Sequence, residues 1–278
     1  MWAGQIVGPR RVELREARLP TAGVGEIVVR IEGCGVCGSS LPLWEGRPWF
    51  SYPAEPGAPG HEAWGRCLRD DRPVAGLSQH GFAEFDVMRV DEIVELPEAL
   101  DDSPFPGEAL ACAVNVVRRA RIQKGQSVAV VGLGFLGSTV ARLCELRGAA
   151  VTGVRRGEAP DGEFGIVIEA AGTQEALDAA SRLVASGGVL VIAGYHQDGL
   201  RTIDLQSWNW RGIDVVNAHE REPRAYVDGI RTAARLAAAG ELDVASLVTH
   251  RFGLEELSTA FEAALRRPPG FLKAVVCP

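Results

Sequence analysis

The first hundred residues alternate between short apolar runs and breaks that are polar or rich in glycine and proline, which predicts a mostly β region. Strands are expected near residues 27–31, 63–68, 81–89 and 93–96. Glycines at 33, 35 and 38 follow the first strand and predict a loop that carries Cys34 and Cys37. Prolines and aromatic residues crowd residues 41–60, which favours an ordered loop over a helix.

The pattern changes near residue 104, where longer amphipathic and apolar segments begin. A helix is expected over 109–120, and residues 126–154 predict a strand, a glycine turn, a helix and a second strand, which together make a βαβ unit. Apolar runs near 168, 190 and 215 predict further parallel strands, with helices over 174–184 and 224–239. The last thirty or so residues predict strand, helix and strand, and we expect them to return to the first domain.

A glycine turn in VAVVGLGFLG places Gly132, Gly134 and Gly137 directly after an apolar strand and directly before a helix. In a dinucleotide-binding turn these glycines permit the tight turn, the approach of a pyrophosphate and close packing of helix on strand. Free N–H groups and the helix dipole hold the phosphate, so we expect this turn, with Phe135 and Leu136, to bind the cofactor. The alternative is a glycine-tolerant turn without a ligand.

The second strand of the βαβ unit ends at Val154, where an NAD-binding protein usually offers an acidic residue to the ribose. Arg155 and Arg156 stand there instead, and two guanidinium groups suit the 2′-phosphate of NADP. We therefore expect NADP(H) to be preferred over NAD(H). The alternative is a pair of solvated arginines, because the stretch RRGEAPDGEF leaves no room for the usual helix before the next strand.

Length and composition set the class of protein. The 278 residues suit two domains that share an interface, and 46% hydrophobic with 23% charged residues is typical of a globular protein. The formal charge of −7 argues against a nucleic-acid partner. The N-terminus lacks a secretory signal and no apolar run is long enough to cross a membrane, so we expect a cytoplasmic protein without a membrane partner. Six scattered cysteines do not suggest a disulfide framework.

Three short motifs carry the candidate chemistry: GVCGSS at 35–40, GHEAWG at 60–65 and GEAL at 107–110. In this order, and followed by the glycine turn, they resemble the zinc-dependent medium-chain alcohol dehydrogenases over nearly the whole chain. The resemblance implies an α/β protein with a GroES-like β-rich catalytic domain and a Rossmann domain with a doubly wound parallel sheet. The expected boundaries are 1–118 with 248–278 for the catalytic domain and 119–247 for the Rossmann domain.

The resemblance also implies a catalytic zinc site. Cys37 and His61 are its expected ligands, with Glu62 beside them and Glu108 as the third ligand, directly or through water; Cys112 is the alternative third ligand. Thiolate, imidazole and carboxylate are ordinary zinc donors, and a catalytic site keeps one position open. Ser39 matches the family's hydroxyl that hydrogen-bonds the reacting oxygen and passes on its proton.

Each site residue also has a plain structural interpretation. Cys37 could be a small buried residue, His61 a hydrogen-bonded loop histidine and Glu108 a carboxylate favoured by a helix dipole. Ser39 could be an ordinary turn serine. One site is nevertheless a simpler explanation than three coincidences in the family's order. The other cysteines are expected to serve in packing: Cys34, Cys67, Cys144 and Cys277.

Several departures from the family pattern define a shortened member. Ser40 replaces the usual Asp, so the carboxylate that would orient the zinc-binding histidine is absent. Pro42 stands where some members have a histidine that relays protons. The four-cysteine lobe that binds a structural zinc is missing, so we expect one catalytic zinc and no structural one.

We therefore expect an oxidoreductase that transfers hydride between NADP(H) and a small or medium secondary alcohol or ketone with the assistance of zinc. The alternatives are a zinc-free NADPH-dependent reductase of an activated double bond and a non-redox binding protein on the same scaffold. Four aromatic residues could line a substrate pocket or simply pack their loop: Trp44, Trp49, Phe50 and Tyr52. The resemblance implies a homodimer or homotetramer, and the composition fits a bacterial protein with a biosynthetic role.

Overall fold

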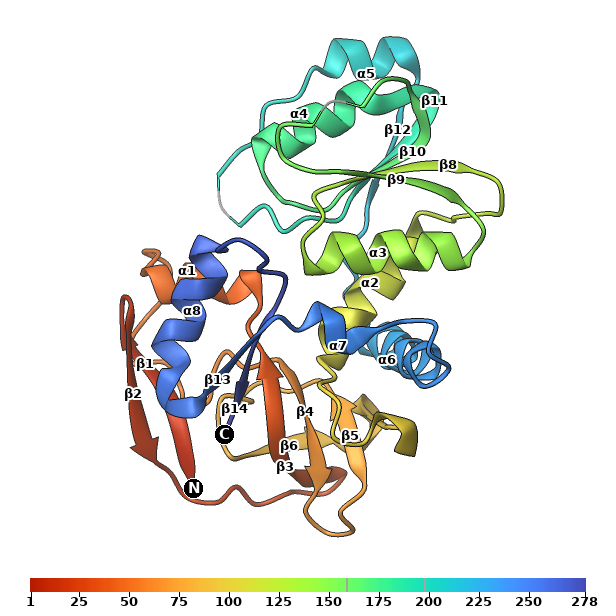
Figure 1. Cartoon of the computed structure of the whole chain (residues 1–278). Helices are drawn as coiled ribbons and strands as arrows, with labels where there is room; N and C mark the ends of the chain where they lie inside the picture. The colour runs from red at the N-terminus through yellow and green to blue at the C-terminus, as the bar shows by residue number, and fades with distance from the viewer. Residues whose placement is uncertain (159, 198) are drawn as a thin grey trace. The chain divides into compact units, whose positions relative to one another are not determined.

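A computed structural model describes residues 1–158, 160–197 and 199–278, and the chain divides into two units (Figure 1). The first unit comprises Met1–Ala111 and Glu222–Pro278, and the second comprises Cys112–Arg221. Within the described ranges, no helix is long and apolar enough to cross a membrane.

A seven-stranded sheet forms the centre of the first unit, in the order β13-β14-β3-β4-β5-β7, with β6 paired to β3. The C-terminal residues return to this unit as predicted, since Val275 pairs with Gly35 and Val276 with Cys34. The strands are β3 (Glu26–Gly35), β4 (Glu62–Cys67), β5 (Pro73–Gly76), β6 (Phe85–Arg89), β7 (Ile93–Glu95), β13 (His250–Gly253) and β14 (Ala274–Cys277).

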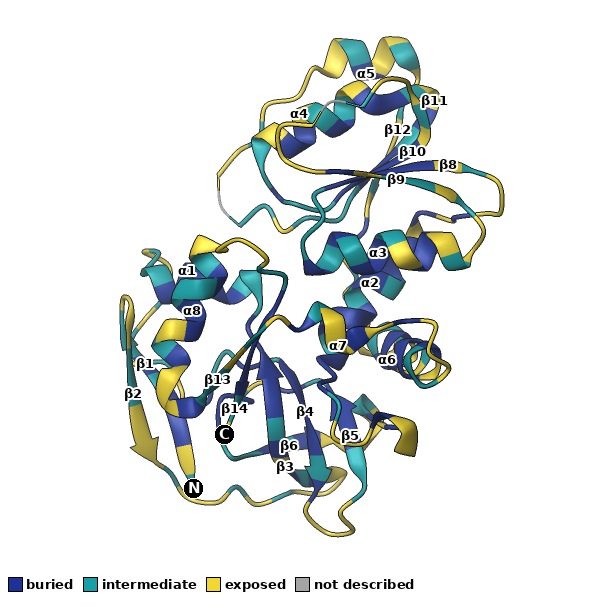
Figure 2. Ribbon diagram, viewed as in Figure 1, coloured by how far each residue is buried: buried dark blue, intermediate teal, exposed yellow. Residues whose placement is uncertain are grey.

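An apolar core packs one side of this sheet against helix α8 (Leu257–Arg266) and the short helix α1 (Leu41–Glu45). The Trp44 ring stacks on Phe261 with centroids 5.2 Å apart, and Phe82 meets Phe261 edge-on at 5.6 Å. The buried residues of these elements are coloured dark blue on the ribbon of Figure 2. A separate hairpin of β1 (Trp2–Gly8) and β2 (Arg11–Glu16) completes this side.

Two local predictions for this unit were wrong. Strand β3 runs on to Gly35, and its glycines serve close packing: a Cβ on Gly33 would lie 2.2 Å from the Trp64 ring, and one on Gly35 only 1.9 Å from a Glu62 oxygen. The segment 41–60, expected as a loop throughout, begins with the five-residue helix α1. Pro42 fits there because the first turn of a helix needs no N–H from it.

The second unit holds a five-stranded parallel sheet in the order β12-β11-β10-β8-β9, as predicted from its apolar runs. Its strands are β8 (Ser127–Val131), β9 (Ala150–Val154), β10 (Phe164–Glu169), β11 (Val184–Ile192) and β12 (Asp214–Asn217). Helix α3 (Phe135–Leu146) joins β8 to β9, α4 (Gln174–Leu183) joins β10 to β11, and α5 (Leu205–Arg211) joins β11 to β12.

This sheet shows where the second unit is shortened. The usual Rossmann order 3-2-1-4-5-6 appears here as 2-1-4-5-6, because β9 is an edge strand and the third strand with its preceding helix is missing among the described residues. The linker between β9 and β10 contains no helix in its described part, as predicted, and Ala159 in it lies outside the described residues.

The observed division of the chain differs from the expected boundaries at helix α6 (Pro223–Ala238). This helix contacts β5 and β7, and a Cβ on Gly229 would lie 2.7 Å from Ala111, so it belongs to the first unit. Helix α2 (Gly107–Arg119) contains the other cut, between residues 111 and 112. The remaining elements are α7 (Val244–Leu247) and four 3-10 turns: η1 (Gly38–Ser40), η2 (Val90–Glu92), η3 (Glu98–Leu100) and η4 (Leu254–Glu256).

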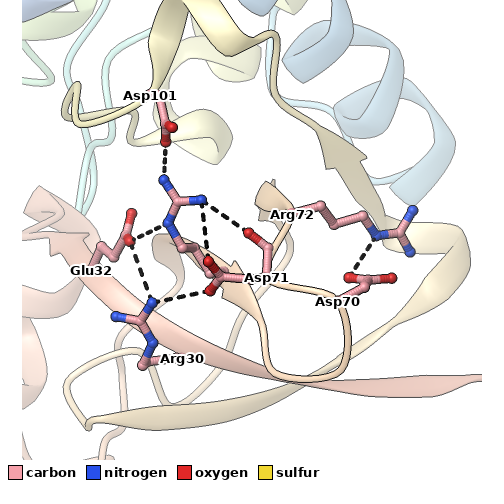
Figure 3. A network of polar contacts seen from close by, with 7 residues as sticks. Arg30, Glu32, Asp70, Asp71, Arg72 and Asp101 are labelled. Atoms are coloured by element: carbon pink, nitrogen blue, oxygen red, sulfur yellow. Dashed lines mark hydrogen bonds and ion pairs between the residues drawn. The ribbon is translucent and has the colours of Figure 1, made fainter.

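Strands β3 and β4 are braced at one end by a polar network (Figure 3). The Arg66 guanidinium donates to Glu32 at 2.9 Å, to the carbonyl oxygen of Asp71 at 2.9 Å and to the Asp101 carboxylate. Because Arg30 pairs with Arg66 and Gly35 pairs with Glu62, the network lies at the opposite end of this strand pair from Glu62. The register of the pair shifts between Ile31 and Gly33, so the two ends are separated by an irregularity.

Candidate functional site

Three potential metal ligands meet where β3 ends and β4 begins. Cys37 lies two residues after β3, His61 directly precedes β4, and Glu62 is its first residue. One ligand atom from each lies within 4.8 Å of the others. The pairing of Gly35 with Glu62 produces this meeting, since it brings the two chain ends that carry the motifs side by side.

The His61 ring is oriented by a backbone carbonyl. Nδ1 lies 2.8 Å from the Pro59 oxygen, which can only accept, so Nδ1 donates. Nε2 then faces the site, 3.4 Å from the Ser39 hydroxyl, which donates to the Cys37 sulfur at 3.1 Å. A carbonyl thus orients the ring, while the Ser40 hydroxyl is buried and has no hydrogen-bond partner among the described residues.

The electrostatic field of the site favours positive charge. Burial lowers the pKa of His61, but the hydrogen bond to Cys37 and the charges of Cys37, Glu108 and Glu62 outweigh it and raise the pKa to about 10. An imidazole that holds its proton this firmly lies among groups that would be satisfied by a cation. A metal ion bound at Nε2 would replace that proton.

Lys273 is a site residue that sequence analysis missed. Its Nζ lies 2.6 and 2.5 Å from the two carboxylate oxygens of Glu62, and both side chains are buried. Burial lowers the pKa of Lys273, but the charges of Glu62, Cys37 and Glu108 raise it above its ordinary value. The signal in the sequence was a single lysine in the apolar segment FLKAVV, which carries no information about its partner.

Glu108 lies in the first turn of α2, and its charge raises the pKa values of His61 and Lys273. It therefore contributes to the field of the site. The ligand cluster found among the described residues contains Cys37, His61 and Glu62, and neither Glu108 nor Cys112 belongs to it. The choice of third ligand stays a prediction.

The residues present fit a zinc ion by the chemistry of their donor set. Tetrahedral zinc with bonds of about 2.0–2.3 Å holds its ligand atoms about 3.3–3.8 Å apart, so a cluster within 4.8 Å needs only a small side-chain movement. Thiolate, imidazole and carboxylate leave a fourth position for another ligand. The competing partner is Lys273, because its Nζ donates to Oε1 of Glu62 and lies within ion-pair distance of Oε2, which has no hydrogen-bond partner among the described residues.

The glycine turn of the second unit has the backbone that a dinucleotide turn requires. Gly132 adopts a φ of 95°, and a Cβ there would lie 2.8 Å from Ala171. A Cβ on Gly137 would lie 1.8 Å from the Gly132 oxygen, so the helix could not lie so close with any larger residue. Helix α3 begins after Gly134 without a side-chain cap, and a helix N-terminus of this kind favours an anion.

The two expected arginines lie just beyond β9 and are exposed. Arg156 has 82% of its side chain exposed and lies 3.8 Å from Glu175. The backbone N–H of Arg155 donates to the Glu158 carboxylate at 2.7 Å. An acidic side chain thus lies beside the expected 2′-phosphate position, a feature that sequence analysis overlooked.

Most of the aromatic residues expected near the substrate serve in packing. Trp44 is buried, Phe50 and Tyr52 pack against the core of the first unit, and the Tyr52 hydroxyl donates to the Leu43 oxygen. Trp49 is 57% exposed and is the member of the set that a ligand could reach. Cys34, Cys67 and Cys144 are buried as predicted, whereas Cys277 is only half-buried.

Whole-chain comparisons relate this protein to dehydrogenases. It is 24% identical to L-galactonate-5-dehydrogenase of Escherichia coli (strain K12), with 96% of each chain covered, and 22% identical to sorbitol dehydrogenase of Ovis aries, with 93% of this chain and 92% of the relative covered. A protein of Sinorhizobium meliloti 1021, described as a zinc-binding dehydrogenase and bound to NADP, superposes with a TM-score of 0.84 at 23% identity over 100% and 99% of the two chains. No family model matches the chain.

The first of these alignments spans 335 positions, more than the 278 residues of this chain, so parts of the relative face gaps.

Proposed function

Because the chain is a shortened member of the medium-chain dehydrogenase/reductase family, we propose that it is a zinc-assisted oxidoreductase that transfers hydride between NADP(H) and a secondary alcohol or ketone. The observation that carries this proposal is the cluster of Cys37, His61 and Glu62. Its donor types are those of a catalytic zinc site, and it occurs in a chain whose relatives are dehydrogenases over their whole length.

In this proposal Cys37 and His61 hold the zinc, with Glu62 or Glu108 as the third ligand. A bound zinc would supply Lewis acidity toward the alcohol or carbonyl oxygen. The Pro59 carbonyl keeps His61 Nε2 directed at the site, and Lys273 keeps Glu62 in place with its charge balanced. The chain therefore presents its ligands in one orientation before any ion arrives.

Ser39 is the proposed proton carrier. Its Oγ lies 3.1 Å from the Cys37 sulfur and 3.4 Å from His61 Nε2, so it is within reach of a group held by both. A serine hydroxyl can donate and accept at once, which is what passing a proton requires. Pro42 has no proton to relay, so the next acceptor after Ser39 is water rather than a side chain at position 42.

The cofactor is proposed to bind at the glycine turn of the second unit, where helix α3 begins without a side-chain cap and its dipole favours a pyrophosphate. Nicotinamide supplies the hydride chemistry. Arg155 and Arg156 are exposed, Arg156 is 3.8 Å from the exposed Glu175, and a turn of both side chains toward a 2′-phosphate is part of the proposal; a protein of similar fold was solved with NADP. Glu158 opposes this preference by its charge, so NADP(H) selectivity depends on the arginines outweighing one carboxylate.

The proposed substrate is a small, polar secondary alcohol or the matching ketone. The relatives' names specify a sugar acid and a polyol, which are secondary alcohols of this kind. Trp49 would contribute the one exposed aromatic surface of its segment. A role in a bacterial biosynthetic pathway is part of the same proposal.

A zinc-free reductase of an activated double bond is the second candidate. The ion pair between Lys273 and Glu62 favours it, because the ammonium group already satisfies one of the three clustered ligands. A carboxylate paired with an ammonium group in this way needs no metal ion to balance its charge.

The two candidates are separated by metal content and cofactor titration. Protein purified without chelator is analysed for zinc and titrated calorimetrically with NADPH and NADH. Cys37→Ala is compared with Cys277→Ala, a matched change at a half-buried cysteine of β14. Zinc lost only from Cys37→Ala supports the proposal, whereas zinc-free wild-type protein that binds NADPH firmly supports the second candidate.

The proposed assembly is a homodimer or homotetramer, and the proposed location is the cytoplasm. Edge strand β12 supports assembly, since its outer side has no partner strand among the described residues and Val215 on it is 41% exposed. None of the six cysteines, all of which lie in the described part of the chain, forms a disulfide, which suits a reducing compartment.

A further inference from the structure

A buried carboxylate organises the short connection between β5 and β6. Asp86 is 5% exposed, and its Oδ2 accepts from the Ser78 hydroxyl at 2.6 Å, from the Gln79 N–H at 3.3 Å and from the His80 N–H at 3.1 Å. Its Oδ1 accepts from the Val87 N–H at 2.8 Å. Three of these four donors come from residues 78–80, so the carboxylate fixes the shape of the turn there.

This turn, residues 78–82, contacts the segment that precedes His61, residues 55–60, at three points. His80 Nε2 lies 2.8 Å from the Glu55 carboxylate, the Phe82 N–H donates to the Gly57 oxygen at 3.1 Å, and the Gly81 N–H donates to the Gly60 oxygen at 2.8 Å. The Ser78 hydroxyl also lies 2.7 Å from the Gly60 oxygen, but it has one proton and serves that oxygen or Asp86 at a given moment.

The two segments are closely packed against each other. A Cβ on Gly57 would lie 2.4 Å from the His80 oxygen, and one on Gly60 would lie 2.5 Å from the Phe82 nitrogen. Gly60 also pairs with His80 as an isolated parallel bridge. A displacement of residues 78–82 is therefore transmitted to residues 57–60 rather than absorbed between them.

Residues 55–60 determine the orientation of the His61 ring. Pro59 is one of these residues and accepts the Nδ1 proton of His61 at 2.8 Å, and Gly60 is the residue before His61. Where the family uses a carboxylate to orient this histidine, the present chain uses a loop carbonyl. The position of this carbonyl depends on the conformation of its loop. The loop has no regular secondary structure of its own over 57–60 apart from the bridge.

We propose that Asp86 is a positioning residue for His61: it shapes the turn at 78–82, the turn holds residues 55–60, and this fixes the Pro59 carbonyl that orients the imidazole. This inference rests on the proposed metal site and adds to it a group that contacts neither metal nor substrate. It assigns a role to the connection that occupies the place of the missing lobe.

The charges around Asp86 agree with this role. Hydrogen bonding to Asp86 is the main cause that raises the pKa of His80 to about 9, with Glu55 adding to it against the effect of burial. His80 is therefore a cation between two carboxylates. The donors to Asp86 outweigh its burial and lower its pKa, so it stays ionised.

The test compares Asp86→Asn with Asp91→Asn, the same change at an exposed aspartate on the neighbouring turn. In Asp86→Asn the amide nitrogen faces N–H donors and His80 loses a counter-charge. Zinc affinity is measured by chelator competition, and the geometry of the site by the absorption spectrum of the cobalt-loaded protein. The hydrogen exchange of the backbone amides of Gly57, Gly60, Gly81 and Phe82 is measured in metal-free protein.

We expect Asp86→Asn to bind zinc about 10-fold more weakly, at the low end for groups outside the ligand shell, with an altered cobalt spectrum and faster exchange of these four amides. Asp91→Asn should match the wild type in all three. A change in stability alone would leave the spectrum of the folded, loaded protein unaltered. If Asp86→Asn does not fold, Glu55→Gln releases His80 at an exposed position and should act in the same direction with a smaller effect.

Unchanged exchange and an unchanged cobalt spectrum in a folded Asp86→Asn protein would overturn the inference. Failure of the proposed function has a different signature. If wild-type protein binds neither zinc nor cobalt, the metal site is wrong, and the exchange of the four amides in metal-free protein still decides whether Asp86 holds the segment before His61.

Discussion

Replacing Lys273 with methionine removes the charge of this buried side chain while keeping much of its length, and it leaves the Glu62 carboxylate without its ammonium partner. Glu62 is 1% exposed and Lys273 is 6% exposed, so water cannot take the place of the lost cation. Removing one member of a buried ion pair costs about 3–5 kcal/mol. We expect Lys273→Met to lower the free energy of unfolding by that amount in the absence of metal.

The reciprocal variant and the double variant make the prediction sharper. Glu62→Gln leaves the Lys273 ammonium unpaired and should cost a similar amount, whereas Lys273→Met with Glu62→Gln leaves no unpaired charge and should regain stability to within about 1–2 kcal/mol of the wild type. The assay is urea and thermal unfolding in the presence of chelator. At roughly 2–4 °C per kcal/mol, each single variant should unfold about 6–20 °C lower.

Unfolding measured with added zinc connects these variants to the proposed metal site. With Lys273 gone, both oxygens of Glu62 are free to bind an ion, so added zinc should stabilise Lys273→Met more than it stabilises the wild type. Single variants that each cost under about 1 kcal/mol, or a double variant whose loss equals the sum of the two, would refute the reasoning that the pair is buried and coupled.

Three further predictions concern other charges. Zinc affinity should rise about tenfold per pH unit between pH 6 and 8, because His61 with a pKa of about 10 must release its proton; a flat titration contradicts this. The contribution of His80 to stability should be complete below about pH 6.5 and be lost as pH rises through about 9, because the raised pKa of His80 favours the folded state only while it is protonated. With 38% of the side chain exposed we expect this contribution to be about 1–2 kcal/mol and to be absent in His80→Gln. Arg155→Ala with Arg156→Ala should lower the NADPH to NADH affinity ratio at least about tenfold, and Glu158→Gln should raise it a few-fold, measured by calorimetry.

The sequence predicted the parts of the fold that depend on local pattern. The βαβ unit around Gly132 and the strands near 168, 190 and 215 carry strong apolar runs, and each forms where it was expected. The return of the C-terminal residues to the first domain was also foreseen, whereas the pairing of their strand with β3 was not predicted. The glycines at 33 and 35 were misjudged because close packing against Trp64 and Glu62 leaves the same residue type as a loop does.

Contacts between distant residues explain most of what was missed at the site. Lys273 meets Glu62 across 211 positions, and no local pattern encodes such a pairing. The sequence shows that Ser40 replaces an acid, but not that the Pro59 carbonyl takes over the orienting bond. Helix α6 was predicted correctly as a helix, yet the unit to which it belongs depends on the contact between Ala111 and Gly229, which are distant in the sequence.

Zinc content is the most direct test of the central account, in which Cys37 and His61 hold a zinc ion in an NADP(H)-dependent oxidoreductase. Elemental analysis of wild-type protein purified without chelator should give about one zinc per chain, and the same analysis of His61→Ala should give almost none, as expected for a site with three protein ligands. Wild-type protein free of zinc, or a His61→Ala variant that keeps it, would contradict the account.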